Sequence, residues 1–317
     1  MTTTVYFATN RVVNHPADRH GSYTSGMVSP DNPLQVTYGT AFVDSAGLTA
    51  DKTGAIISIQ DLQRGGFSPT AFADLADGGR NILVFIHGFA NSFENAITRA
   101  AFNREWFADC GVADADTAVV AFSWPSRGEV ITPPFPTFAY RSDQKAAGNS
   151  GMHLMRFFSN LLPILEKARN NGRRTFLLAH SMGNLALQGA VETWFANGNG
   201  DARLFDEAIL AAPDVVDSAL AAPGPLSSLN RLARRISILY SNGDKVLDIL
   251  SENLNGATRL GQDGPRSRDD VTLFPAATYR MVDCGGFTDY DADFQGSHQY
   301  YRRSKGVRKE IAALMAP

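Results

Sequence analysis

Cysteine is scarce in this sequence of 317 residues, which contains only Cys110 and Cys284. Two cysteines cannot build a disulfide framework, and neither belongs to a C-x-x-C pair of the kind that holds structural zinc. A chain of about 300 residues can bury roughly three quarters of its unfolded surface, so it needs no such cross-links. The composition therefore predicts a large globular protein without a disulfide scaffold or a structural metal.

The sequence also lacks a large excess of charge of either sign. It contains 29 Lys and Arg and 32 Asp and Glu, which gives a net charge of -3. Proteins that bind nucleic acid or acidic membranes need a positive patch, so we expect neither partner. No apolar run reaches the roughly 18 residues that a transmembrane helix needs. The first residues lack a basic segment followed by an apolar one, so we expect no secretory signal and a cytoplasmic protein.

Apolar runs typical of strands alternate with amphipathic stretches, a pattern that predicts βαβ units and a mostly parallel sheet. Central parallel strands are covered on both faces, which is why they appear as continuous apolar runs. The expected strands are 81–86, 117–122, 175–178, 207–211, 236–240 and 279–282. The expected helices are one that starts at a capping box of Asn91 and Glu94, then 144–168 with a kink or break at Pro163, 181–197, 246–254 and 299–315.

Residues 1–79 differ from the rest because they hold only short strand-like segments, at 36–42 and 55–59, among polar loops. We expect these segments to be antiparallel strands that extend one edge of the sheet. No linker-like segment separates them from the core at 80–317. The prediction is a single domain over residues 1–317.

Ser181 lies in the most specific motif, where the strand at 175–178 runs into Ala179-His-Ser-Met-Gly183 and then directly into a helix. This context fits a nucleophile elbow, whose tight turn needs small residues two before and two after the serine. Ala179 and Gly183 meet that need, although glycine is commoner at the first position. The elbow would hold the hydroxyl in a strained turn at a helix N-terminus, where negative charge is favoured. The alternative is that Ser181 only caps the helix.

A second motif, Ile86-His-Gly-Phe-Ala90, follows another expected strand. A serine that attacks a carbonyl needs N–H donors at the developing oxyanion. We assign these donors to the backbone of Met182, directly after the serine, and of Phe89 in this loop, where Gly88 lets the backbone come close to a substrate. By itself, the loop could equally be a glycine turn into the next helix.

With these motifs the chain resembles the α/β-hydrolase superfamily, and more narrowly a bacterial branch of α/β hydrolases of unknown function. The features that carry the resemblance span nearly the whole chain: Tyr6–Arg11, His87–Phe93, Phe122–Pro125, Ala179–Gly183, Ala212–Asp214 and Ser297–Tyr300. The resemblance implies an α/β-hydrolase fold, with a mostly parallel sheet of about eight strands and helices on both faces. It also implies a Ser–acid–His triad in that chain order.

Given this order, His298 is the predicted base, because it is the only histidine after Ser181. Three aspartates at the ends of expected strands compete for the role of the acid. We favour Asp244, after 236–240, because most members of the superfamily carry the acid on the corresponding strand. Asp214 is the alternative that some members use, and Asp283 is the third candidate.

Aromatic residues and prolines follow the strand at 117–122, and ligands of open α/β sheets bind beyond the carboxyl ends of the strands. This pattern predicts an apolar pocket formed by four aromatic residues: Trp124, Phe135, Phe138 and Tyr140. The alternative is that these side chains only pack the loop against the protein. The polar stretch at 255–275 is expected to be a surface loop near the site.

The function predicted from these residues is hydrolysis of a small-molecule carboxylic ester through an acyl-enzyme on Ser181, with no cofactor and no metal. Two alternatives remain. The same site could act on another acyl compound, such as an amide, lactone or thioester, or transfer the acyl group. The fold could also serve as a non-catalytic binding module.

Overall fold

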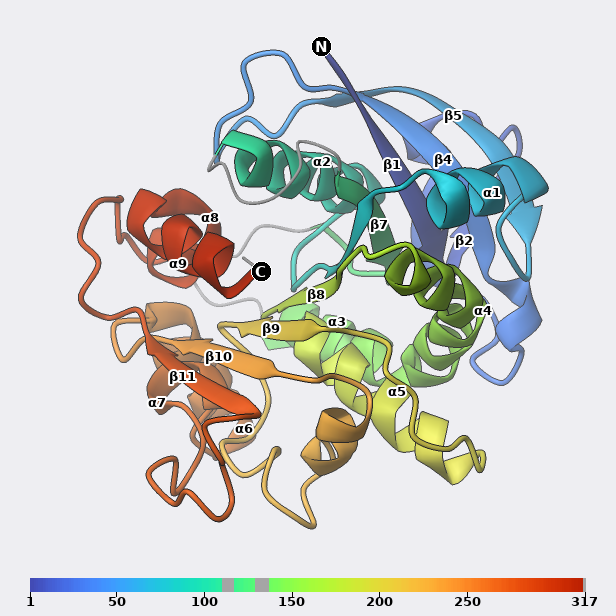
Figure 1. Cartoon of the computed structure of the whole chain (residues 1–317). Helices are drawn as coiled ribbons and strands as arrows, with labels where there is room; N and C mark the ends of the chain where they lie inside the picture. The colour runs from blue at the N-terminus through green and yellow to red at the C-terminus, as the bar shows by residue number, and fades with distance from the viewer. Residues whose placement is uncertain (110–116, 129–136, 316–317) are drawn as a thin grey trace.

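A central sheet organises the computed structural model, which describes residues 1–109, 117–128 and 137–315. Within these residues the sheet has nine strands (Figure 1). Their spatial order is β11 (Tyr279–Asp283), β10 (Ile236–Tyr240), β9 (Glu207–Ala211), β8 (Thr175–His180), β6 (Asn81–Ile86), β7 (Thr117–Ser123), β1 (Thr2–Thr9), β4 (Thr37–Asp44) and β5 (Ala55–Arg64). The strands from β11 to β1 are parallel, whereas β4 and β5 are antiparallel to their neighbours. The α/β-hydrolase fold class is confirmed, with one strand more than expected.

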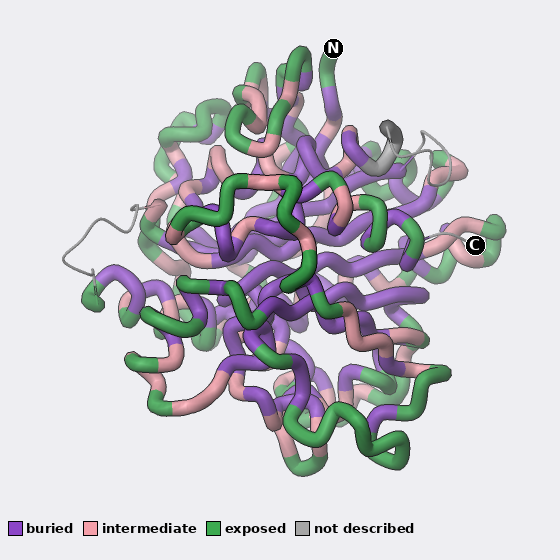
Figure 2. The backbone as a smooth tube through the Cα atoms, turned by 90° about the vertical axis from the view of Figure 1, so that its left-hand side faces the viewer, coloured by how far each residue is buried: buried purple, intermediate pink, exposed green. Residues whose placement is uncertain are grey.

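The six apolar runs of the sequence form the parallel strands β6 to β11, with ends that differ by at most two residues from those expected. Every residue of β6, β7, β8, β9 and β10 is buried, while the edge strand β11 is only partly covered. Figure 2 shows this buried backbone as a purple band through the middle of the molecule. Continuous apolar character thus reflects cover on both faces of the sheet.

The N-terminal region contributes more than edge strands. The segments expected at 36–42 and 55–59 form β4 and β5, antiparallel at the edge as predicted. However, β1 was not expected, and it lies inside the sheet, where Phe7 is paired with Ala121 of β7 and with Gly39 of β4. A small second sheet pairs β2 (Arg11–Val13) with β3 (Tyr23–Met27), and a helix, α1 (Pro69–Asp77), leads into β6.

Helices cover both faces of the sheet (Figure 1). One apolar core lies between the sheet and α1, α3 (Thr137–Asn149), α4 (Gly151–Asn170) and α5 (Gly183–Ala196). The other lies beneath α2 (Phe93–Asp109), α8 (Tyr300–Arg303) and α9 (Lys305–Met315). Among the described residues, none of the helices combines the length and the apolar character needed to cross a membrane.

Several expectations about helix boundaries were wrong. The helix expected at 299–315 is divided at Ser304 into α8 and α9. The capping box of Asn91 and Glu94 does not form, because α2 begins at Phe93 and the Ser92 hydroxyl accepts the N–H of Asn95 (3.1 Å). Asn91 is engaged with the preceding loop instead.

The helix expected at 144–168 is broken at Ser150, between α3 and α4, and Pro163 lies inside α4. The Ser150 hydroxyl donates to the carbonyl of Ala146 (2.7 Å) and accepts from the Asn10 amide (2.9 Å). A serine side chain that bonds to the backbone in this way competes with the helical pattern.

Cys284 is a buried free thiol at the end of β11. Burial, with a smaller contribution from Asp283, raises its pKa to about 12, so it is a poor nucleophile at neutral pH. Cys110 lies outside the described residues.

The contact between α4 and α5 requires glycine, because a Cβ on Gly151 would lie 2.6 Å from the carbonyl carbon of Gly189. We expect Gly151→Ala to lower the free energy of unfolding by about 1–3 kcal/mol through overpacking. Gly148→Ala is the matched control, since its Cβ would meet no atom within 4 Å. Alanine should there be neutral or stabilise by up to about 1 kcal/mol. Urea unfolding of both variants measures the difference, and equal stabilities would contradict the tight helix contact.

Candidate active site

The turn between β8 and α5 holds Ser181 in a strained conformation, with φ at 54°. A non-glycine residue in the left-handed region costs on the order of 1–3 kcal/mol and persists only where its neighbours hold it. The N–H of Ser181 donates to the carbonyl of Ala211 in β9 (2.9 Å). The amide of Asn184 donates to the carbonyls of Ala179 (3.0 Å) and Ser181 (3.1 Å). Hydrogen bonds on both sides thus hold the turn.

Two glycines let this turn approach the end of β6. A Cβ on Gly183 would lie 2.6 Å from the carbonyl oxygen of His87, and a Cβ on Gly88 would lie 2.8 Å from the Cβ of Ser181. Neither position can carry a side chain unless the backbone moves. The small residues of both motifs therefore bring the loop after β6 directly against the serine.

Ser181, His298 and Asp244 form a continuous line of hydrogen bonds. His298 Nδ1 lies 2.7 Å from Asp244 Oδ2, and His298 Nε2 lies 2.7 Å from Ser181 Oγ. A carboxylate can only accept, so Nδ1 donates to it and Nε2 is left to accept the hydroxyl proton. This is the arrangement that a nucleophile, a general base and an orienting acid require.

The second oxygen of Asp244 is also held in place. Its Oδ1 accepts the N–H groups of Val246 and Leu247 (both 3.1 Å) at the start of a π-helical turn, η4 (Val246–Glu252). With one oxygen bound by the backbone, the other is directed at the imidazole of His298. Residues 246–254, expected as one helix, form η4 followed by the short α6 (Asn253–Asn255).

The surroundings of His298 favour its protonated form. Burial of the imidazole alone would lower its pKa, but the charge and hydrogen bond of Asp244, together with the charge of Asp214, raise it above the ordinary value of 6.5. The neighbouring His180 behaves in the opposite way, because burial and the charge of His298 hold its pKa well below 6.5. Neutral His180 can donate from Nε2 to the carbonyl of His298 (3.2 Å), which helps to fix the base.

Phe89 and Met182, whose backbone N–H groups were assigned to the oxyanion, are both close to Ser181: Met182 follows it in the chain, and Phe89 lines the same cavity. Within the described ranges, neither N–H group has a protein acceptor. The amide of Asn91 binds the carbonyls of Gly88 (2.9 Å) and Phe89 (2.8 Å). Because the C=O and N–H of a trans peptide point in opposite directions, the bond to Gly88 turns the N–H of Phe89 away from Asn91. Neither donor is thus satisfied by a hydrogen bond within the described protein.

The family model described as alpha/beta hydrolase of unknown function (DUF900) matches residues 70–314. The chain belongs to this family. The matched segment contains Ser181, Asp244, His298 and the loop after β6. The resemblance inferred from the motifs is therefore confirmed, and no curated protein sequence matches the chain.

In this alpha/beta hydrolase, two buried charged residues support the loop after β6. The Arg11 guanidinium donates to the carbonyls of Asn91 and Ser126 (both 2.9 Å). The carboxylate of Asp143 accepts from the Ser126 hydroxyl (2.5 Å), which itself accepts the N–H of Asn91 (2.9 Å). Neither residue could be given a role from the sequence. The only signal was the place of Arg11 at the end of the motif Tyr6–Arg11.

Asp214, the alternative acid, is buried near the serine but bonds to other groups. Its Oδ1 pairs with Arg259 Nε (2.9 Å), and its Oδ2 accepts from the Tyr140 hydroxyl (2.9 Å). The hydroxyl of Ser251 also donates to its carboxylate. The third candidate, Asp283, is exposed and accepts the N–H of Gly285 (2.9 Å). Only Asp244, of the three, is hydrogen-bonded to His298.

The expectation of a surface loop at 255–275 was wrong for its first part. Arg259 is buried by its ion pair with Asp214, and the following residues form a short helix, α7 (Leu260–Asp263), with a buried start. The physical reason is that a buried carboxylate needs a cation, which this segment supplies.

A cavity of about 110 Å³ lies next to Ser181 and His298. Of the four predicted pocket residues, Tyr140 lines it, beside Phe89. Trp124 does not line it, because it is fully buried, stacks on His87 and donates to the His87 carbonyl (2.7 Å). Phe138 points to solvent with 72% of its surface exposed, and Phe135 lies outside the described residues.

In the part of the chain that the structure covers, no three His, Cys, Asp or Glu side chains are grouped so that they could hold a metal.

The buried pair of Asp214 and Arg259 predicts a large effect on stability. We expect Asp214→Asn to lower the free energy of unfolding by about 3–5 kcal/mol, because it leaves the Arg259 charge buried without a counter-charge. Asp201→Asn is the control, since it breaks an exposed pair with Arg231 and should cost no more than about 1 kcal/mol. Chemical denaturation of the two variants gives both values. Equal losses would show that Asp214 does not support the fold in this way.

Proposed function

We propose that this protein is a serine hydrolase that cleaves carboxylic esters through an acyl-enzyme on Ser181. The observation that carries the proposal is the line of hydrogen bonds from Ser181 through His298 to Asp244, which opens onto a cavity. Membership of an alpha/beta hydrolase family supports hydrolytic chemistry. The two backbone donors without a protein acceptor in the described chain supply what an oxyanion needs.

In the first half-reaction, Ser181 Oγ attacks the ester carbonyl while His298 Nε2 takes the hydroxyl proton. The charge that develops on the carbonyl oxygen accepts hydrogen bonds from the N–H groups of Phe89 and Met182. When the tetrahedral intermediate collapses, His298 returns the proton to the leaving alcohol. Asp244 orients the imidazole and stabilises its charged form throughout.

In the second half-reaction, water replaces the alcohol. His298 takes a proton from the water, whose oxygen attacks the acyl carbon and forms a second tetrahedral intermediate. Collapse of this intermediate breaks the bond to Ser181 Oγ, which recovers the proton from His298. The products are the carboxylic acid and the free enzyme.

The strained φ of Ser181 favours a catalytic role over a non-catalytic binding module. A serine that only capped α5 would not need the left-handed conformation, because N-cap residues adopt ordinary extended angles. Strain of this kind is found at sites where the geometry serves a function.

Substitution of the serine and of the acid tests the proposal. Ser181→Ala should lower kcat for p-nitrophenyl acetate by at least about 10³-fold and abolish labelling by a fluorophosphonate probe, and Asp244→Asn should cost up to about 10⁴-fold. Asp248→Asn is the matched control, because Asp248 is an exposed carboxylate in the same helical turn, η4. Thermal melts check that each variant is folded. Labelling of Ser181→Ala equal to that of the wild type would rule out Ser181 as the nucleophile.

The pH dependence of the reaction follows from the raised pKa of His298. The imidazole acts as a base only when it is neutral, so kcat/KM should fall as pH decreases through a midpoint above 6.5. In Asp244→Asn, the NMR titration of the imidazole should move to lower pH, because burial is then opposed only by the charge of Asp214. The substrate for the kinetic profile is again p-nitrophenyl acetate, which does not ionise. A wild-type midpoint below 6.5, or a titration that Asp244→Asn leaves unchanged, would contradict this assignment.

A further inference from the structure

Three arginines line the cavity beside the serine, although the chain as a whole is slightly acidic. Arg99 comes from α2, and Arg302 and Arg303 come from α8. The proposed mechanism uses none of them. Cationic side chains gathered around a small cavity therefore need an explanation of their own.

These charges are only partly balanced in the residues that the structure describes. Arg99 has no carboxylate within ion-pair distance there, and its guanidinium donates to the side-chain oxygen of Asn91. Arg302 donates to Gln299 (2.8 Å), and the carboxylate in reach of it, Asp51, is 4.0 Å away. The positive charges of Arg99 and Arg302 at the cavity are therefore not fully neutralised by carboxylates in the described residues.

Arg303 shares the same acidic partner. Its Nη2 lies 2.8 Å from Asp51, and its Nη1 lies 3.8 Å from Asp293. Both of these carboxylates are mostly exposed, so water screens them. The Nε of Arg303 is buried and has no hydrogen-bond partner among the described residues. A buried donor without an acceptor is unfavourable unless a ligand supplies one.

The remaining carboxylate in the cavity wall, Asp214, does not balance these charges, because it is already paired with Arg259. The arginines also affect one another. Burial lowers the pKa of Arg99 to about 10, and the charges of Arg302 and Arg303 act in the same direction. An anion bound between them would relieve this repulsion. Guanidinium groups suit that task, since they bind carboxylate and phosphate through paired hydrogen bonds.

We propose that the substrate of this site carries an anionic group, a carboxylate or a phosphate, which Arg99, Arg302 and Arg303 bind while Ser181 attacks the acyl carbonyl. The inference rests on the proposed function for the reaction itself, but the anion site is open to an independent test.

Matched pairs of esters test the preference for an anion. Monoethyl succinate and ethyl 4-methylpentanoate differ chiefly in a carboxylate against an isopropyl group on the acyl side. Acetoxyacetate and isobutyl acetate make the same comparison on the alcohol side. In at least one pair, kcat/KM of the wild type should be at least about tenfold higher for the anionic ester than for the neutral one. Added salt should reduce the ratio of these two kcat/KM values. Ratios near one in both pairs, while the neutral esters are cleaved, would overturn the proposal.

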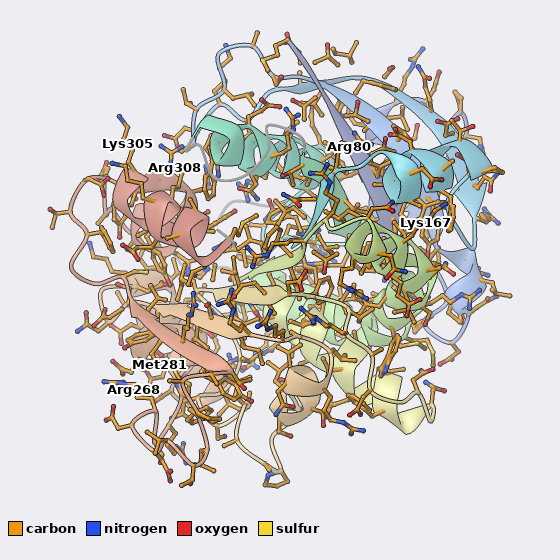
Figure 3. All side chains as sticks on the ribbon, viewed as in Figure 1. Arg80, Lys167, Arg268, Met281, Lys305 and Arg308 are labelled. Atoms are coloured by element: carbon orange, nitrogen blue, oxygen red, sulfur yellow. The ribbon has the colours of Figure 1, made fainter. Side chains whose placement is uncertain are left out.

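Substitution of the arginines assigns the preference to these residues. Arg303→Gln should reduce kcat/KM for the preferred anionic ester by about tenfold or more, through KM, and change that of the neutral ester by less than about threefold. Arg99→Gln should also lower the anionic rate, but it removes the bond to Asn91 as well, so the rate on the neutral ester should fall with it. Arg268→Gln is the control, since it removes the same charge at an exposed site beside β10 and β11 (Figure 3). Arg99→Lys keeps the charge without the planar fork and should recover only part of the loss. If Arg268→Gln lowers kcat/KM for the anionic ester as much as Arg303→Gln does, the effect comes from the net charge of the protein and the proposal is wrong.

A binding measurement separates this inference from the proposed function. Calorimetric titration of Ser181→Ala with succinate or with inorganic phosphate should show binding, weakened about tenfold or more by the further change Arg303→Gln. If only one of the two anions binds, the result shows whether the site recognises a carboxylate or a phosphate. If the fluorophosphonate fails to label Ser181 but the anions bind, the hydrolase proposal fails and the anion site stands. If Ser181 is labelled and neither anion binds, the anion site is excluded and the hydrolase remains.

Discussion

The close approach of two backbone turns is the constraint on which the candidate site depends. The loop after β6 meets the turn at Ser181 so closely that a side chain at Gly88 or Gly183 would collide with the opposite backbone or with Ser181 itself. This contact places Phe89 in the wall of the same cavity as Ser181, and Met182 follows the serine directly in the chain. It also explains why the serine keeps a strained φ, since Ala211 and Asn184 fix the turn from the other sides.

Buried charges secure this contact from behind. Arg11 and Asp143 bind the loop after β6 through Asn91 and Ser126, and they come from β2 and α3, which are distant in the sequence. Such polar groups are stable in the interior because nearly all their hydrogen bonds are made within the protein. The need to neutralise a buried charge also explains why Arg259 is buried, although its segment has the sequence of a polar loop: it forms the ion pair with Asp214. Among the cavity arginines, Arg303 differs from Arg11 in that its buried Nε has no hydrogen-bond partner in the described chain.

Much of the fold could be predicted because the signals are local. The parallel strands are covered on both faces, so each one appears in the sequence as an uninterrupted apolar run with clear ends. Strand β1 escaped prediction because its segment ends in polar residues and its place between β7 and β4 depends on pairing with distant strands. The break at Ser150 was missed because proline is the stronger local signal, whereas the actual break depends on bonds to Ala146 and Asn10.

The sequence by itself determined the family, the fold class and the short list of residues around Ser181, because small residues next to a strand end leave few possible turns. It did not determine which carboxylate meets His298, since Asp244 and Asp214 both follow strands that end at the same edge of the sheet. Only the tertiary structure decided this: Arg259, Tyr140 and Ser251 bind Asp214, while the backbone of η4 directs Asp244 at the imidazole. The convergence of Arg99, Arg302 and Arg303 was likewise beyond the sequence, because α2 and α8 become neighbours only after both have packed on the same face of the sheet.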